Sequence, residues 1–431
     1  MEKKSGKNKF LELIGGELQK CSKCGACRTI CPVFAENQRE KYSARGKIAL
    51  SDAVAQGVLP LTDEYYDILN NCILCLSCVE NCSSGVKVDK IIRAARALLV
   101  EQRGLPLPQR IIHKMLQHGK EFMDLILKKG SLFQYIFFKS IPKTSGLRRR
   151  FPMPLIDKTR YIPTLVRKPF RKRVTERVEA AVPKKSVVFF TGCCTNYIYP
   201  NIGEAVVKVL NELGISVIIP KGQMCCGAPA ETAGDLHTVI ELAQNNINEL
   251  LFEEEKYKVV LPCSSGGYMF KHIYPELFQN DAKIMSQAKK LALLTCDISE
   301  YLVKEVGLDK IAGHIKQAFT KKITYHDPCH LNRGQGIKTE PRKLLKILSG
   351  ESFVEMDEAD RCCGSGGVYG IKHRSISNKI LSRKIDSIKN SEAEIVATGC
   401  PGCIIQLLDG INQKNLNIRV LHTVEALAEC I

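Results

Sequence analysis

No apolar run in the sequence is long enough to cross a membrane. The apolar stretch at residues 130–138 is bounded by Lys129 and Lys139, whereas a transmembrane helix needs about 20 apolar residues. A secretory signal is also missing, because residues 1–9 are rich in charge and no apolar segment with a small-residue cleavage site follows them. These absences predict a cytoplasmic protein that can contact a membrane only peripherally, on its inner face.

Fingerprints for two common ligand classes are absent as well. Gly364 and Gly366 follow a cysteine pair and lack the spacing of a dinucleotide-binding loop, so no flavin or nicotinamide site is expected. No nucleic-acid-binding motif accompanies the positive charge of the chain, and nucleic acid is therefore not expected as a partner. With 431 residues, the chain has room for roughly two to four domains with cores of their own.

Cysteine, in contrast, is abundant. In a cytoplasmic chain, twenty cysteines indicate reduced metal ligands rather than disulfides. Eight of them form two runs with the spacing Cys-x2-Cys-x2-Cys-x3-Cys, which is typical of ferredoxins with two [4Fe-4S] clusters, and the fourth Cys of each run then binds the other cluster. Zinc knuckles are the alternative interpretation. We predict one [4Fe-4S] cluster at Cys21, Cys24, Cys27 and Cys82, and a second at Cys72, Cys75, Cys78 and Cys31.

Cysteines recur in the second half of the chain in a pattern that occurs twice. Each copy has one Cys, then a Cys-Cys-Gly triplet, then a further Cys, with nearly equal intervals between them. A duplicated α/β unit explains this repetition. In the earlier copy Gly266 stands where the later copy has its fifth thiol, and Cys194 is the alternative fifth thiol there. The later copy carries Cys329, Cys362, Cys363, Cys400 and Cys403, and the earlier copy carries Cys193, Cys225, Cys226 and Cys263.

Five thiols in the later copy favour a metal cluster over a single ion. A zinc site closes with four ligands, while five thiolates can surround several irons. Glycines at 364, 366 and 367 let the backbone bend so that two adjacent cysteines face one site. A structural zinc site, or a thioredoxin-like pair at Cys400 and Cys403, are the alternatives. In the earlier copy, four thiols suit a [4Fe-4S] cluster, a zinc ion, or reduced thiols in a unit kept for its fold.

Three polar residues flank Cys329, namely His326, Asp327 and His330. We interpret them as hydrogen-bonding partners of the metal ligands rather than as ligands themselves. For Asp327, capping of the following helix is the alternative.

These patterns predict a multidomain fold in which a helical two-cluster ferredoxin domain is followed by two duplicated α/β cysteine-rich domains. The expected domains are residues 1–100, a basic linker at 101–185, and two cysteine-rich domains at 186–310 and 320–431. We name the last two the first and second CCG units, after their Cys-Cys-Gly triplets. Helices are expected at residues 44–58, 65–69, 88–102, 201–213, 231–255, 341–348 and 375–388, and strands at 186–190, 215–219, 258–261, 322–325 and 394–398.

The linker at residues 101–185 differs in composition from the rest. It holds twenty-one Lys and Arg against six Asp and Glu, with apolar and aromatic residues interleaved and prolines in its second half. One interpretation is a connector with a helical hairpin packed on its neighbours. The other is a basic, apolar-studded face that meets anionic lipid or an acidic partner subunit.

The order of these features resembles a known family. Two ferredoxin runs, the phrase Arg45-Gly46-Lys47-Ile48, a basic linker and two CCG units look like the iron–sulfur subunit of glycolate oxidase and its D-lactate dehydrogenase relatives. The resemblance implies an electron-transfer subunit of an oxidoreductase complex. In such a complex a separate FAD-containing subunit oxidises the 2-hydroxy acid, and this chain passes the electrons to a quinone, a cytochrome or another acceptor.

The CCG units also resemble those of heterodisulfide reductase, D-type. That resemblance implies a further iron–sulfur cluster in the second CCG unit, and as an alternative function the reduction of a disulfide at Cys329, Cys362, Cys363, Cys400 and Cys403. Gly266 departs from the five-cysteine pattern in the first unit. A zinc-bound scaffold is the non-redox alternative.

Overall fold

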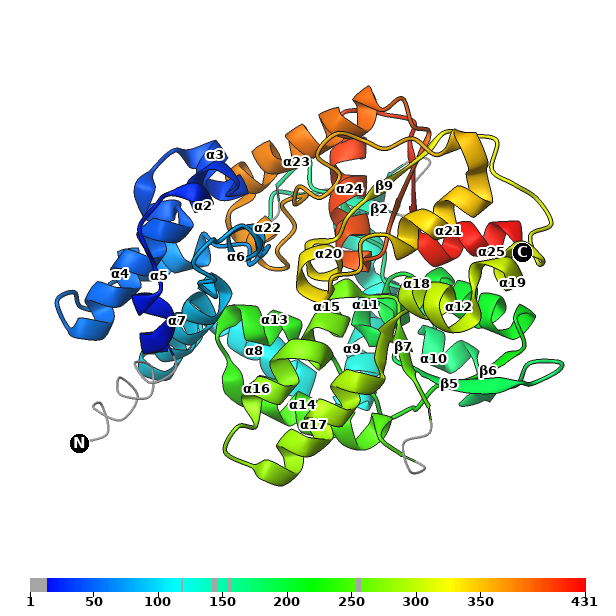
Figure 1. The fold of residues 1–431 in the computed structure, drawn as a ribbon, viewed down its shortest axis with the longest axis horizontal. Coiled ribbons are helices and arrows are strands. Elements are labelled where there is room, and N and C mark those ends of the chain that lie inside the picture. The colour runs from blue at the N-terminus through cyan, green and yellow to red at the C-terminus, as the bar shows by residue number, and fades with distance from the viewer. Residues whose placement is uncertain (1–13, 118, 142–145, 154–156, 253–256) are drawn as a thin grey trace.

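A helical domain lies at one end of the molecule, and two α/β units lie at the other (Figure 1). The computed structural model describes residues 14–117, 119–141, 146–153, 157–252 and 257–431, so the charged stretch at residues 1–9 lies outside the described residues. Within the described residues, no helix is long and apolar enough to span a bilayer.

The N-terminal domain is helical, as predicted. Ser43 and Thr62 each accept a hydrogen bond from the backbone amide of the third residue of the helix that follows, which fixes where α4 and α5 begin. Gly46 packs so closely on the preceding turn that a Cβ there would lie 2.0 Å from the Glu40 carbonyl oxygen. The helices are α2 (Ala26–Thr29), α3 (Pro32–Asn37), α4 (Ala44–Gln56), α5 (Asp63–Asn70), α6 (Ser77–Glu80) and α7 (Val88–Arg103), with a 3-10 turn at Glu40–Tyr42.

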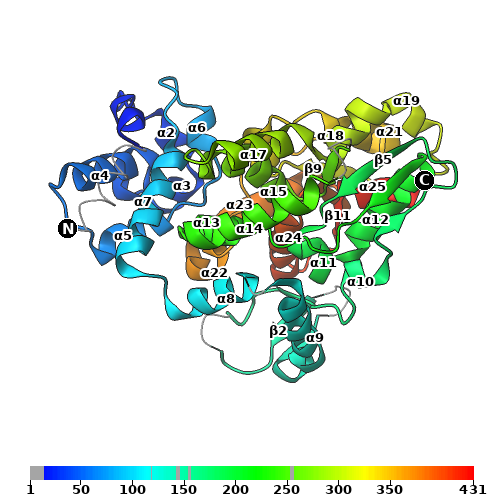
Figure 2. The same cartoon turned by 90° about the horizontal axis from the view of Figure 1, so that it is seen from below.

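The linker begins with two helices, α8 (Leu107–Gln117) and α9 (Gly119–Phe137), which lie along one edge of the molecule (Figure 2). A small antiparallel sheet follows, formed by β1 (Phe138–Ser140), β2 (Gly146–Arg149) and β3 (Ile162–Pro163). Asp409 of the second CCG unit is fully buried and accepts hydrogen bonds from Arg160 and the Tyr161 amide. The linker is therefore tied into the fold rather than loosely attached.

The end of the linker differs from the expected boundary at residue 185. After α10 (Phe170–Arg173), β4 (Arg177–Val178) pairs antiparallel with β6 and becomes the edge strand of the first CCG unit. The sheet of that unit has the order β4-β6-β5-β7-β8. Its parallel strands are β5 (Lys185–Phe189), β6 (Ile215–Ile218), β7 (Val259–Leu261) and β8 (Thr295–Asp297), and most of their residues are buried, as in a sheet covered on both faces.

Helices cover this sheet. The helix expected at 231–255 is in fact two helices, because Gly234 adopts a φ of 87° and Asp235 then caps a new helix through the Thr238 amide. The helices are α11 (Gly192–Tyr197), α12 (Pro200–Glu212), α13 (Ala228–Ala233), α14 (Leu236–Leu250), α15 (Ser264–Tyr268), α16 (Tyr274–Leu277), α17 (Ala282–Leu294), α18 (Ile298–Tyr301) and α19 (Leu308–Ala312), with π-helical turns at Met269–Ile273 and Leu302–Val306.

The second CCG unit repeats this plan. Its parallel sheet has the order β11-β10-β9. On the other side of β9, Phe353 forms a single parallel bridge with Ile323, at the place that β6 takes beside β5 in the first unit. The predicted duplication is therefore present in the strand order. The strands are β9 (Ile323–His326), β10 (Ile395–Thr398) and β11 (Arg419–His422), and the helices are α20 (Cys329–Gln335), α21 (Glu340–Ser349), α22 (Tyr369–Lys372), α23 (Arg374–Asn390), α24 (Pro401–Gln413) and α25 (Thr423–Cys430), with a 3-10 turn at Gly350–Ser352.

One hydrophobic cluster spans the two CCG units, beside a further cluster within each. Helix α25 of the second unit packs on α12 of the first, and α18 of the first packs on α21 of the second. Val206, Leu344 and Leu427 belong to the same buried cluster. The packing of these helices across the boundary joins the two units.

The helical domain packs against both CCG units. Helix α7 contacts α13, while α3 contacts α23 and α6 contacts α20. Buried Arg96 on α7 donates to the carbonyls of Leu69, Cys72 and Thr232, which joins a cysteine loop to the first CCG unit. The cysteine loops are thus held against the rest of the protein.

Candidate metal centres

The structure brings the eight N-terminal cysteines together in the two predicted groups. One cavity is lined by Cys21, Cys24, Cys27 and Cys82, and also by Cys78 of the other group. A second cavity is lined by Cys31, Cys72, Cys75 and Cys78. The fourth cysteine of each run thus lies with the other run, although the ligand roles themselves stay a prediction.

The two cysteine loops have the same backbone shape. Lys23 and Leu74 have φ values of 58° and 56°, and Gly25 and Leu76, two residues further on, have φ values of 85° and 62°. Positive φ is uncommon for leucine, so the second loop keeps the conformation of the first without its glycine. Backbone amides also point at sulfur, because Phe34 N lies 3.5 Å from the Cys31 Sγ and Val86 N lies 3.4 Å from the Cys82 Sγ.

All five cysteines of the second CCG unit meet in one group, and four of them are buried while Cys329 is half-buried. Cys329 contacts Cys362, which contacts Cys363, and Cys403 lies between Cys363 and Cys400. Cys329 and Cys403 lie in the first turns of α20 and α24, Cys400 follows β10, and Cys362 and Cys363 lie in the loop before α22. The pair at Cys400 and Cys403 is part of this larger group, so the thioredoxin-like alternative does not describe its surroundings.

One thiol of the first CCG unit joins this group. Cys263 contacts Cys400 across the interface between the units. The spacing of the cysteines assigns Cys263 to the first unit. Its contact with Cys400 could not be predicted from that spacing, because it arises from the packing of the two units. Cys400 therefore has neighbours from both units.

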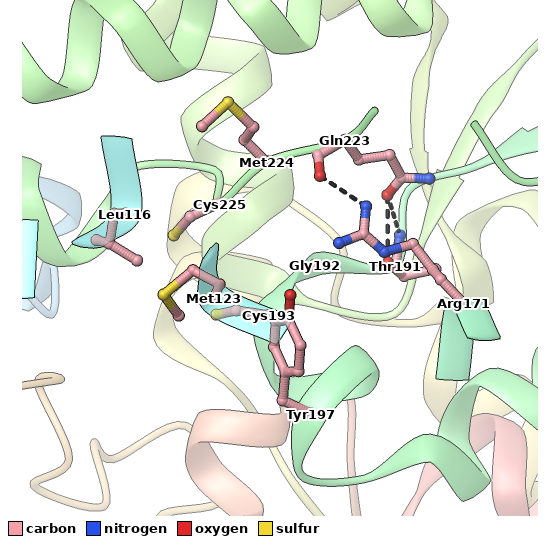
Figure 3. Close-up of a pocket in the computed structure, with 10 residues that line it drawn as sticks. All are labelled: Leu116, Met123, Arg171, Thr191, Gly192, Cys193, Tyr197, Gln223, Met224 and Cys225. Atoms are coloured by element: carbon pink, nitrogen blue, oxygen red, sulfur yellow. Dashed lines mark hydrogen bonds between the residues drawn. The ribbon is translucent and has the colours of Figure 1, made fainter. Parts of the chain in front are cut away.

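The other thiols of the first CCG unit form a second group. Cys193 contacts Cys194 and Cys225, and Cys225 contacts Cys226. Cys193 and Cys225 line a pocket beside Leu116 and Met123, which come from the linker helices (Figure 3). The linker thus covers the thiols of the first unit.

The Cys-Cys-Gly triplets bend in the same way in both units. Gly227 and Gly364 have φ values of 84° and 83°, and their amides lie 3.5 Å and 3.4 Å from the sulfurs of Cys225 and Cys362. Gly366 and Gly367 also adopt positive φ. The prediction that glycine provides this bend is confirmed.

The polar residues around Cys329 have distinct partners. Asp327 is buried and forms a two-point ion pair with Arg342, at 2.8 and 2.6 Å. The cap of α20 is Pro328, without a side-chain hydrogen bond, so the helix-capping alternative for Asp327 is wrong. His330 Nε2 lies 3.0 Å from the Leu74 carbonyl oxygen, and its ring stacks on Tyr268. His330 thereby links the helical domain to both CCG units.

Two buried groups flank the thiols of the second unit. Burial lowers the pKa of His326 to about 3, and the Lys384 ammonium acts in the same direction. Burial also lowers the pKa of Lys384 to about 8, and its ammonium donates to the carbonyls of Glu358 and Ala359. Lys384 was missed from the sequence. Its position between Leu381 and Ile388, on the apolar face of α23, could have indicated a buried lysine.

The second N-terminal cavity adjoins the thiols of the second CCG unit. Cys75 and Cys362 belong to one buried apolar cluster, with Cys31 and Cys329 packed against it. Burial raises the pKa of Cys75 to about 12, and the Cys362 thiol adds to the shift. The two sites are therefore neighbours although they are far apart in the sequence.

The donor sets fit iron–sulfur clusters. The cavity of Cys31, Cys72, Cys75 and Cys78 presents four cysteines, which is the number that holds a [4Fe-4S] cluster. The other cavity presents the four cysteines of its predicted group together with Cys78. The second CCG unit presents five thiols in contact, more than a zinc ion takes.

Comparisons with known proteins place this arrangement in a class. The 4Fe-4S dicluster domain matches residues 17–86, and the cysteine-rich domain matches residues 187–271 and 323–408. The fold and site thus define an iron–sulfur protein with a dicluster domain and two cysteine-rich domains.

Relatives identify the family. The chain is 31% identical over 438 residues, 99% of its length and 97% of the relative's, to the "Probable glycolate oxidase iron-sulfur subunit" of Bacillus subtilis (strain 168). The chain belongs to this family of iron–sulfur subunits. It is also 33% identical over 241 residues to lactate utilization protein A of Bacillus subtilis (strain 168), covering 56% of this chain and 98% of the relative. A third relative is a component of the fumarate reductase (CoM/CoB) of Methanothermobacter marburgensis, at 28% over 95% of this chain and 72% of the relative.

Proposed function

We propose that this chain is the electron-transfer subunit of a flavin-linked 2-hydroxy-acid dehydrogenase. An FAD-containing partner subunit oxidises glycolate or D-lactate, and a quinone, a cytochrome or another acceptor receives the electrons. The names of the relatives, glycolate oxidase iron–sulfur subunit and lactate utilization protein, support the substrate class. The observation that carries the proposal is the contact between the second N-terminal cavity and the thiols of the second CCG unit at Cys75 and Cys362.

In this proposal, the N-terminal domain holds two [4Fe-4S] clusters at the two cysteine groups. The second CCG unit holds a further iron–sulfur cluster at Cys329, Cys362, Cys363, Cys400 and Cys403. When bound, such clusters accept and release electrons at potentials set by charge, hydrogen bonds to sulfur and solvent exposure. The first CCG unit, without a fifth thiol at Gly266, has the lesser role.

The residues between the sites hold them in fixed positions. Ile73, Tyr369 and Ile380 pack with Cys75 and Cys362 in one buried apolar cluster. His330 holds the Leu74 carbonyl, and Arg96 holds the Cys72 carbonyl, on either side of this contact. The chain thereby fixes the separation of two metal-binding loops from different domains.

A second candidate function is disulfide reduction at the second CCG unit. The specific observation in its favour is the group of five contacting thiols there. The fumarate reductase relative, whose name includes CoM/CoB, supports it only weakly.

A reconstitution experiment tests the proposal. The purified chain is expected not to oxidise glycolate or lactate with an artificial acceptor, because the sequence shows no flavin site. Its visible cluster absorbance should bleach once the co-purified flavoprotein and substrate are added. Iron and sulfide analysis of anaerobic protein separates this outcome from a zinc scaffold. Turnover of glycolate or lactate by the chain alone, with no flavin detected, would contradict the proposal. Reduction of a disulfide without the flavoprotein would favour the second candidate function.

Peripheral contact with the cytoplasmic face of the membrane is a further part of the proposal. The linker helices α8 and α9 turn polar side chains toward the protein: His113 lies 2.7 Å from Asp235, and Gln134 hydrogen-bonds to the backbone of Leu165. Most of their large apolar side chains are exposed instead, whereas Leu116 and Met123 line the pocket beside Cys193. The exposed set is Leu107, Ile111, Ile112, Phe122, Leu125, Leu132, Phe133, Tyr135, Ile136 and Phe137.

The charge around these helices complements an anionic lipid surface. Lys114, Lys128, Lys129 and Lys139 are exposed beside the apolar residues. A helix that is apolar on its outer face and flanked by basic residues is suited to the interface of a bilayer. We therefore assign this face to a bilayer surface.

Sedimentation with liposomes is expected to show binding to anionic vesicles that weakens as salt rises, because exposed charges are screened over about 10 Å at ~0.1 M ionic strength. Phe133→Ser combined with Ile136→Ser should reduce the binding. Leu293→Ser, which removes an exposed apolar side chain on α17, serves as the control. Equal binding to neutral and anionic vesicles, or loss of binding in the control, would contradict the assignment.

A further inference from the structure

The two CCG units differ at two matched positions, and the second position was not apparent from the cysteine pattern. His326 and Phe190 each stand three residues before the first cysteine of their unit, His326 as the last residue of β9 and Phe190 directly after β5. Cys403 and Gly266 each stand three residues after the cysteine that precedes α24 or α15. The second unit therefore has a histidine and a cysteine where the first has a phenylalanine and a glycine.

These two positions are neighbours in both units. In the second unit, one ligand atom each from His326, Cys363 and Cys403 all lie within 4.8 Å of one another. In the first unit, a Cβ built on Gly266 would lie 3.8 Å from the Cε1 atom of Phe190. The two units thus differ at two adjacent positions. Phe190 and Gly266 in the first unit occupy the places of His326 and Cys403, which can bind metal, in the second.

The imidazole of His326 is placed as metal-binding histidines are. It is 1% exposed and hydrogen-bonds to the backbone of Ala359. Its Nδ1 atom has no hydrogen-bond partner among the residues that the structure describes. Histidines that bind metals commonly donate one ring N–H to a carbonyl and present the other nitrogen to the metal. A buried ring nitrogen without a partner is otherwise unfavourable.

We propose that His326 supplies a nitrogen ligand, together with Cys363 and Cys403, to the iron–sulfur centre of the second CCG unit. This inference rests on the proposed function, which places a cluster there. The first unit has no equivalent ligand, because Phe190 fills the position. The matched change at two neighbouring positions gives the second unit two metal-binding groups that the first unit lacks.

Spectroscopy on the anaerobically reconstituted full chain tests the ligand. Protein labelled with 15N-histidine is studied by pulsed EPR in its oxidised and reduced states, and protein enriched in 57Fe is studied by Mössbauer spectroscopy. The wild-type chain is expected to show a strongly coupled histidine nitrogen. His326→Phe, which copies the first unit, should lose it, and the matched control His330→Gln should keep it. His326→Cys should retain the iron and change the Mössbauer parameters of one iron site, since sulfur then replaces nitrogen.

The outcomes separate this inference from the proposed function. Two [4Fe-4S] clusters account for about eight irons per chain. An iron content at that level, unchanged in Cys400→Ser, would overturn the third cluster and the histidine ligand together. A higher iron content with no coupled nitrogen, or with a Mössbauer spectrum unchanged in His326→Cys, would overturn the ligand alone. Should His326→Phe fail to fold, the wild-type signal and the His326→Cys variant still decide.

Discussion

Cys400→Ser or Cys363→Ser is expected to abolish electron transfer from the flavoprotein through this chain. Cys400 contacts Cys263 and Cys403, and Cys363 contacts Cys362 and Cys403, so each variant interrupts the buried thiol group at its centre. The clusters of the N-terminal domain should remain, because their cysteines lie in separate cavities. Iron content and turnover are measured together for each variant, after reconstitution with the flavoprotein.

Two further variants serve as comparisons. Cys226→Ser alters the first CCG unit, where Gly266 replaces the fifth thiol, and it should cost less activity or act mainly through stability. Cys296→Ser alters a buried thiol in the shared core that belongs to neither metal-binding group, and it should leave the iron content unchanged. Equal loss of iron and activity in Cys226→Ser and Cys400→Ser would show that the first unit also carries an essential cluster.

Cys31→Ser is expected to remove the cluster of the other cysteine run. The Cys31 thiol lines the cavity of Cys72, Cys75 and Cys78 and receives the Phe34 amide there. The loss should be about four irons of the roughly eight in the two [4Fe-4S] clusters. Electron transfer should fall with it, because this cavity adjoins the second CCG unit at Cys362.

EPR of the reduced protein reads out which cluster is lost. Cys21→Ser is the matched variant, and it should remove the signal of the other centre while that of the Cys72 run persists. If Cys31→Ser removed only the centre held by Cys21, Cys24 and Cys27, the crossed assignment would be wrong. Each variant also reports on the order of the centres, because the cavity of Cys31, Cys72, Cys75 and Cys78 lies against the second CCG unit.

Local patterns predicted the individual elements well. The helices expected at 44–58, 88–102 and 375–388 are present within a few residues as α4, α7 and α23. The helix expected at 231–255 failed at Gly234, where a left-handed residue and an aspartate cap outweighed the apolar period. The strand at Arg177–Val178 is too short to show a period, and only its pairing with β6 defines it.

Sequence alone determined the cysteine groups of the N-terminal domain and the duplication of the CCG unit. Ligands spaced two or three residues apart are confined by the chain itself, so their spacing predicts which of them meet. The bend at each Cys-Cys-Gly triplet follows for the same reason, because glycine permits a positive φ wherever it occurs.

Only the tertiary structure decided which distant groups meet. Cys263 lies near Cys400 because α25 packs on α12 and α18 packs on α21, which joins the two CCG units. Cys75 lies near Cys362 because the helical domain packs against these units. The exposure of the apolar sides of α8 and α9 was likewise not predictable from the sequence. A periodic pattern shows that a helix has two faces but not which of them the protein covers. Contacts between segments hundreds of residues apart depend on the packing of whole domains, and no spacing along the chain records them.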